Sequence, residues 1–167
     1  MFRKFSVVLF AAAILACTSL AQDHPNFAGT WKLNLSKSNG GDYGPTTRTD
    51  VITQEGSKFT EKVTSVMAQL GESDYTLTFT ADGNKVTIAP DSQQSNMGVL
   101  TLKDITASWG DASLIVTTDS SYQGQVDVTN KSTYTLSSDG KTLTITSHVS
   151  TSGAPGDFDT SLVFEKQ

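Results

Sequence analysis

Histidine and cysteine, which commonly carry catalysis or bind metals, are few in this chain and lie far apart. The two histidines, His24 and His148, have no neighbours at a catalytic or metal-ligand spacing. His24 precedes the first strand-like segment and is expected to lie in a tail, whereas His148 is expected to be an ordinary strand residue. Asp157 and Asp159 alternate onto one face of a strand, where a surface role is expected rather than acid–base catalysis or calcium binding.

Other chemistries also lack their motifs. The sequence has no Gly-x-Ser-x-Gly nucleophile elbow, no phosphate-binding glycine loop and no zinc motif. The many Ser and Thr residues are what β-strands favour. We therefore predict a protein that is not an enzyme and holds neither a metal nor a cofactor.

The N-terminus has the pattern of a secretory signal. Two cations, Arg3 and Lys4, precede an uncharged apolar run of roughly 12 residues, which is too short to cross a bilayer core of about 30 Å. Ser19-Leu20-Ala21 offers small residues to a signal peptidase, and cleavage is expected before Gln22. The expected location is therefore the periplasm or the exterior of the cell.

A second interpretation of the same segment is a lipoprotein signal. Ile14-Leu15-Ala16-Cys17 resembles a permissive bacterial lipobox, in which the cysteine becomes the lipidated first residue. Lipidation of Cys17 would place the protein on the outer membrane. Cys17 is also the only cysteine, so a chain cleaved after Ala21 has no disulfide and depends on its hydrophobic core.

Removal of a signal peptide at residues 1–21 leaves one domain at residues 22–167, long enough to bury a sizeable core. Ten cations then face 17 acids, a formal charge of −7. This charge argues against nucleic acid as a partner. We expect a monomer without a transmembrane span.

Alternation of apolar and hydroxyl residues dominates the rest of the sequence and is typical of half-buried strands. No segment has a convincing helical pattern. The predicted strands are 28–35, 46–54, 57–66, 73–80, 85–89, 98–108, 112–119, 125–137, 141–150 and 157–165. The stretch 90–97 is expected to be a loop or a continuation of its neighbours.

Four turns separate these segments in an up-and-down order: Glu55-Gly56, Asp82-Gly83-Asn84, Gly110-Asp111 and Asp139-Gly140. An open sheet of about ten strands would leave two edges free to aggregate, so a closed barrel or a two-layer sandwich is required. Short turns leave little chain for the crossovers of a sandwich. The sequence therefore predicts an all-β, antiparallel up-and-down barrel of about 8–10 strands.

The first predicted strand carries a family resemblance. Asn26-Phe27-Ala28-Gly29-Thr30-Trp31-Lys32-Leu33 resembles the Gly-x-Trp signature that opens the first strand of lipocalins and related calycin barrels. The resemblance implies a structural role for Trp31, packed across the closed end of the barrel, and for Gly29, which lets the chain bend into the strand. The chain departs from that family in having no arginine near its C-terminus to cover Trp31 and no helix after the barrel.

The whole domain also resembles a group of small, uncharacterised exported bacterial proteins. These begin with a Gly-Thr-Trp-Lys-Leu-Asn strand and contain a Ser-x-Asp-Gly-Lys-Thr-Leu hairpin, here residues 29–34 and 137–143. This resemblance implies a lipocalin-like barrel without implying a ligand.

A barrel of this size can enclose one small molecule. Trp109 is the preferred ligand-binding residue because it adjoins the Gly110-Asp111 turn and so lies at a barrel end, where an aromatic ring can stack on a ligand. Tyr75 and Tyr122 are further candidates.

We expect an exported protein of the bacterial envelope that binds a small, hydrophobic ligand. The alternative is a structural or protein-interaction barrel with a filled core. An enzyme would require a cluster of polar groups with perturbed pKa values inside the cavity. The interior of the barrel discriminates among these three functions. A hollow, apolar interior favours ligand binding, a filled interior favours a structural or interaction role, and a hollow, polar interior favours an enzyme.

Overall fold

The computed structural model describes residues 24–153 and 156–167, which form a single antiparallel sheet with two short 3₁₀ turns. The strands are β1 (Gly29–Leu33), β2 (Pro45–Glu55), β3 (Lys58–Met67), β4 (Gly71–Thr80), β5 (Lys85–Thr87), β6 (Asn96–Met97), β7 (Leu100–Trp109), β8 (Ser113–Tyr122), β9 (Val126–Leu136), β10 (Thr142–Thr151) and β11 (Phe158–Lys166). The 3₁₀ turns are η1 (Leu35–Lys37) and η2 (Gln93–Ser95). Within the described ranges, no helix is long and apolar enough to span a membrane.

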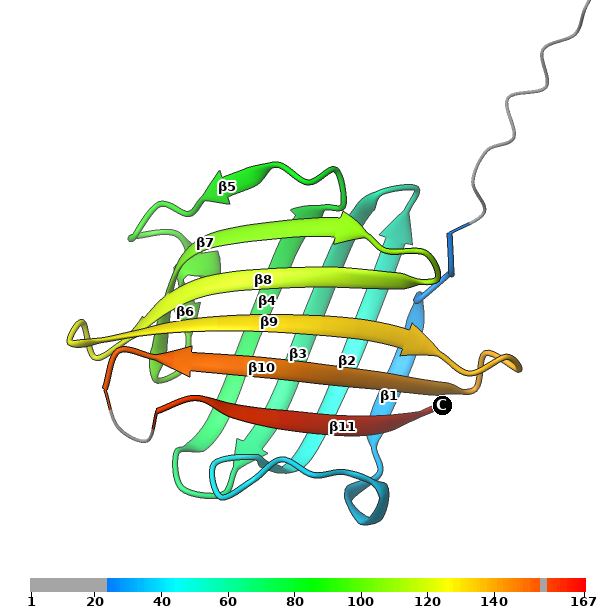
Figure 1. The fold of residues 1–167 in the computed structure, drawn as a ribbon, viewed down its shortest axis with the longest axis horizontal. Helices are drawn as coiled ribbons and strands as arrows, with labels where there is room; N and C mark the ends of the chain where they lie inside the picture. Colours follow the sequence, from blue (N-terminus) through cyan, green and yellow to red (C-terminus); the bar gives the residue numbers. More distant parts are fainter. Residues whose placement is uncertain (1–23, 154–155) are drawn as a thin grey trace, which may run out of the picture.

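The sheet follows the predicted up-and-down order. Ten strands are hydrogen-bonded in the order β4-β3-β2-β1-β11-β10-β9-β8-β7-β5, and β6 pairs with β7 beside this path. In Figure 1, β7 to β11 form a front layer and β1 to β4 cross behind it at a steep angle. The prediction of an all-β up-and-down barrel is therefore confirmed.

Three of the four predicted turns are hairpins, but the turn at Asp82-Gly83-Asn84 is not. The strand that follows it, β5, pairs with β7 instead of returning along β4. A parallel bridge between Ala81 and Ala107 brings β4 beside β7 at this point. Parallel neighbours cannot be joined by a two-residue turn, so the chain instead crosses the seam through residues 82–99.

The seam between β4 and β7 is bridged by side chains at several points. Gln94 Nε2 donates to the Thr78 carbonyl at 2.9 Å, and Ser73 Oγ donates to the Met97 carbonyl at 3.3 Å. These bonds attach the stretch 90–97, predicted as a loop or a continuation, to β4. In the described part of the chain, the barrel is nearly closed, and this seam interrupts the order of its strands.

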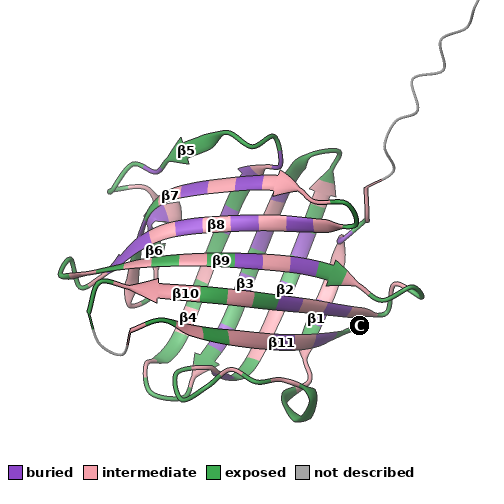
Figure 2. Cartoon of the chain, viewed as in Figure 1, coloured by how far each residue is buried: buried purple, intermediate pink, exposed green. Residues whose placement is uncertain are grey.

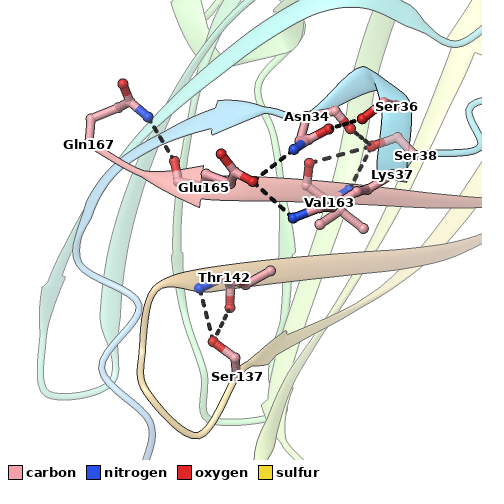
Figure 3. Close-up of polar contacts among 9 residues, drawn as sticks. All are labelled: Asn34, Ser36, Lys37, Ser38, Ser137, Thr142, Val163, Glu165 and Gln167. Carbon is pink, nitrogen blue, oxygen red and sulfur yellow. Dashed lines mark hydrogen bonds and ion pairs between the residues drawn. The ribbon is translucent and has the colours of Figure 1, made fainter.

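β1 is shorter than predicted because the chain leaves it after Leu33 and continues along β11 as an irregular segment. Asn34 N donates to the Val163 carbonyl, and Ser38 Oγ accepts from Val163 N at 2.9 Å. The Glu165 carboxylate accepts from Asn34 Nδ2 at 2.7 Å and Lys37 Nζ at 3.1 Å (Figure 3). Side-chain bonds thus supplement the few backbone bonds that this segment makes to β11.

One end of the barrel, here called the closed end, is filled. It contains the hairpin turns at residues 56, 110 and 140 and the N-terminal segment 24–28. Figure 2 shows the buried positions of β9, β10 and β11 gathered toward this end. The largest fully buried side chains include Trp31, Phe27, Phe59 and Phe164.

Trp31 is fully buried in this packed end. Its indole Nε1 donates to the Phe27 carbonyl at 2.8 Å, and Lys166 Nζ lies 5.1 Å from the centre of its ring. A lysine of the last strand therefore covers the tryptophan where no arginine is present. Gly29 has a φ of +149°, a backbone conformation that L side chains rarely adopt, so glycine fits this position.

Candidate functional site

The other half of the barrel contains a cavity of about 460 Å³. It opens toward the end, here called the open end, that holds the turns after β3, β8 and β10 and the segment 40–45. Tyr43, Gly44 and Pro45 of that segment line the cavity near its mouth. The interior is thus half packed and half hollow.

The cavity wall combines aliphatic and hydroxyl side chains. Leu77, Val116, Ile145 and Leu162 line its deep part together with hydroxyl residues of the front layer. Ser132 Oγ lies 2.8 Å from Ser147 Oγ in one such pair. Because hydroxyls can hydrogen-bond to one another or to a guest, the wall suits a mainly apolar molecule with a few polar atoms.

Two of the three predicted ligand-binding residues lie on this wall. Tyr75 of β4 and Tyr122 of β8 both line the cavity, as do Tyr43 and Tyr134. Trp109 does not line it. Of the five aromatic residues that line the cavity, Phe158 has no polar group, and the other four are tyrosines with hydroxyls that can donate or accept a hydrogen bond.

Trp109 lies at the closed end because the Gly110-Asp111 turn is on the side that the N-terminal segment covers. Its ring stacks on His24 with centroids 4.1 Å apart and lies 5.6 Å from the Phe59 ring. His24 is thus packed against the barrel instead of lying in a free tail. The position of Trp109 at a barrel end was predicted, but this end is not the mouth of the cavity.

A group of charged and phenolic side chains forms the boundary between the packed and hollow halves. This polar cluster consists of Arg48, Asp50, Glu61, Tyr75 and Tyr134. Arg48 Nε donates to Asp50 Oδ1 at 2.7 Å, and Arg48 Nη2 lies 3.5 Å from Glu61 Oε1. Tyr134 Oη donates to Glu61 Oε2 at 3.0 Å.

The cluster has a cavity side and a core side. Arg48, Tyr75 and Tyr134 line the cavity, whereas Asp50 and Glu61 do not. The Asp50 and Glu61 side chains are 0 % and 2 % exposed, and the Arg48 side chain is 16 % exposed. The guanidinium therefore faces the hollow with both carboxyl groups behind it.

Burial shifts the pKa values of this cluster. Loss of hydration, reinforced by repulsion from Asp50, raises the pKa of Glu61 to about 8, and the attraction of Arg48 only partly offsets these effects. Burial would lower the pKa of Arg48, but Asp50 and its other anionic neighbours hold it well above the usual value. Burial also raises the pKa of Tyr75 to about 12. The raised pKa favours the neutral acid form of Glu61 at pH 7.

Two buried oxygen atoms without hydrogen-bond donors are a second indication, independent of the pKa, that Glu61 is protonated. Asp50 Oδ2 and Glu61 Oε1 are both buried and have no hydrogen-bond donor in the described part of the chain. Two ionised carboxylates would leave both acceptors unsatisfied, at a cost of about 1–3 kcal/mol each. A proton on Glu61 that is donated to Asp50 satisfies both atoms.

This protonation makes stability depend on pH. Folding raises the Glu61 pKa from 4.5 to about 8, so the folded protein retains a proton that the unfolded chain releases between these values. The stability gained from this site is complete below pH 4.5 and is lost as the pH rises toward 8, by up to about 1.4 kcal/mol per pH unit.

We therefore expect Glu61→Gln to flatten the pH dependence of unfolding. The amide is neutral at every pH and can still accept from Tyr134, so the variant should lose less stability than the wild type between pH 5 and pH 8.5. Urea unfolding at several pH values measures the difference. Parallel curves for the two proteins would contradict a proton held on Glu61.

The polar cluster was not predicted, although the sequence contains its signal. Arg48 and Asp50 alternate with Ile52 onto one face of β2, and Glu61 lies between Phe59 and Val63 on one face of β3. Charged residues in register with buried apolar ones must point inward in a period-2 strand. The positions of these charged residues in the alternating pattern therefore predict that their side chains point into the barrel.

Other predicted features remain outside this site. Cys17 and the proposed signal peptide lie outside the described residues. In residues 24–153 and 156–167 no group of three or more His, Cys, Asp or Glu side chains is arranged to hold a metal ion. His148 Nδ1 lies 2.8 Å from Asp159 Oδ1 on the exposed side of β10 and β11, away from the cavity.

Comparison of the chain with protein-family models and with curated proteins finds no match.

Proposed function

We propose that this protein is an exported protein of the bacterial envelope that binds a small, largely apolar molecule inside its barrel. The observation that carries the proposal is the hollow half of the interior, about 460 Å³ in volume and open at one end. Ligand sites of small molecules are typically clefts of roughly 300–1,000 Å³ with mainly apolar walls and a few polar groups. This cavity has that size and that kind of wall.

The hollow half favours binding over the two alternatives. A structural or interaction barrel needs no internal space, and an unfilled volume of this size costs dispersion contacts that a packed core would make. The polar cluster has the perturbed pKa values that an enzyme would need. However, its two carboxyl groups lie behind Arg48 and do not line the cavity, so neither is placed to exchange a proton with a guest.

The proposal is tested by filling the cavity. Val149 of β10 lines it, and Val149→Trp should occupy the space that a guest requires. Thr146→Trp, on the exposed side of the same strand, is the matched control. Binding is measured by the fluorescence of N-phenyl-1-naphthylamine, an uncharged apolar probe that brightens when it leaves water.

We expect wild type and Thr146→Trp to bind the probe with similar affinity, and Val149→Trp to bind at least about tenfold more weakly, a change of about 1.4 kcal/mol. Equal binding by all three proteins would place the probe outside the barrel and contradict the proposal. No binding by the wild type would contradict it as well.

Export is the other half of the proposal. It is supported by the sequence of the first 21 residues, and mass spectrometry of the mature N-terminus distinguishes release after Ala21 from lipidation of Cys17.

A further inference from the structure

Among the residues that the structure describes, Arg48 is the only cationic side chain that lines the cavity, and its surroundings restrict what it can bind. Its Nε–H is used by Asp50, and its guanidinium carbon lies 5.5 Å from the centre of the Phe164 ring. Within the described residues, no hydrogen bond is made by its Nη1 group. Arginine therefore offers N–H donors to the hollow side of the cluster.

Tyr75 offers a second donor at the same place. It lines the cavity, its hydroxyl makes no hydrogen bond to another described residue, and it interacts electrostatically with Arg48. A pKa of about 12 keeps this hydroxyl protonated at physiological pH. The floor of the cavity thus presents donors from two side chains and requires an acceptor.

The charge of that acceptor follows from the count of charges in the cluster. Arg48 already has the Asp50 carboxylate at 2.7 Å, and the neutral Glu61 adds no charge. The cluster is therefore neutral as a whole. A carboxylate ligand would place a second anion beside one guanidinium in a buried site, which leaves a net negative charge there without a counterion.

We infer that the ligand presents an uncharged oxygen acceptor, such as that of an alcohol, aldehyde or ester, to Arg48 and Tyr75 at the cavity floor, and that carboxylates are discriminated against by the Asp50 carboxylate behind Arg48. This inference rests on the proposed function. It assigns the carboxyl groups of the cluster a specificity role: they cancel the charge of Arg48 while leaving its N–H donors available.

The test compares two ligands with the same chain, 1-dodecanol and dodecanoate, by displacement of N-phenyl-1-naphthylamine at pH 7. Three proteins are compared: wild type, Glu61→Gln and the double variant Asp50→Asn/Glu61→Gln. Both substitutions preserve shape, and the double variant leaves Arg48 without an anionic partner. The single variant is the matched control because it keeps the cluster neutral.

Wild type and Glu61→Gln should prefer the alcohol by at least about tenfold, and the double variant should shift the preference toward the carboxylate by at least about tenfold. A carboxylate bound as tightly as the alcohol by wild type would overturn the inference but leave the proposed function intact. An unchanged preference in a folded double variant would also overturn the inference. Any apolar cavity disfavours a charged head group, so only a change of preference on removal of the carboxyl groups shows that they set it. Should the double variant fail to fold, Asp50→Ser/Glu61→Gln, which also removes both carboxyl groups behind Arg48, takes its place in the comparison. If the wild type binds neither of the two ligands nor the probe, the inference and the proposed function are both overturned.

Discussion

Replacement of Arg48 by methionine is expected to lower the free energy of unfolding by about 3–5 kcal/mol, because it leaves the Asp50 carboxylate buried without a counterion. Asp50 is 0 % exposed and has a single ionic partner, Arg48, among the described residues. Methionine retains much of the aliphatic stem of Arg48 but not its guanidinium, which lies 5.5 Å from the centre of the Phe164 ring, so the loss is chiefly electrostatic. Urea unfolding at pH 7 measures it.

The matched control for this prediction is the double variant Arg48→Met/Asp50→Asn. With no buried charge left unpaired, it should be more stable than the single variant, although Asn adds a buried amide. A double variant that is as unstable as Arg48→Met would show that Arg48 acts through packing. A loss below about 1 kcal/mol in the single variant would contradict a buried ion pair.

Replacement of Trp31 by alanine is the second large effect, with an expected loss of about 3–5 kcal/mol. Trp31 is fully buried at the closed end, where it contacts the N-terminal segment through the bond from Nε1 to the Phe27 carbonyl. Alanine would remove the indole from a packed region, leave a void and orphan this carbonyl. The free energy of unfolding from urea titration checks the value.

Trp31→Phe serves as the control because it keeps an aromatic ring and loses the indole N–H. We expect a smaller loss than for alanine. Binding of N-phenyl-1-naphthylamine by folded Trp31→Phe should be unchanged, since Trp31 does not line the cavity. Stability close to that of wild type in Trp31→Ala would contradict the role of Trp31 in closing this end of the barrel.

The strands could be predicted because the alternation of apolar and polar residues along the sequence indicates which side chains are buried. In β10, Leu143 and Ile145 face the core while Thr144 and Thr146 are more exposed, which is what a period-2 pattern states. Hairpins such as the one at Asp139-Gly140 were equally predictable, since Gly140 adopts a φ of +67° that glycine tolerates without strain.

The seam could not be predicted in the same way. The turn at Asp82-Gly83-Asn84 has hairpin chemistry, yet β5 pairs with β7. Local turn residues specify a change of direction but not the partner strand, which the closure of the barrel determines. The short β1 has a similar origin, because residues 34–38 bond to β11 through side chains that carry no strand signal.

The site was predictable in part. Tyr75 and Tyr122 are predictable as aromatic residues of strands, and both line the cavity. Trp109 was selected because it lies at a barrel end, but a sequence does not say which end is filled. That depends on the N-terminal segment, whose Phe27 and His24 pack against Trp109 from outside the strands.

The most direct test of ligand binding in the barrel is an amide chemical-shift titration of the full domain with 1-dodecanol. We predict shifts at the ends of β8, β9 and β10 that line the cavity, around Tyr122, Val128 and Val149, with little change around Trp109 and His24. Shifts concentrated around Trp109, or the absence of shifts at saturating alcohol, would contradict binding in the hollow half of the barrel.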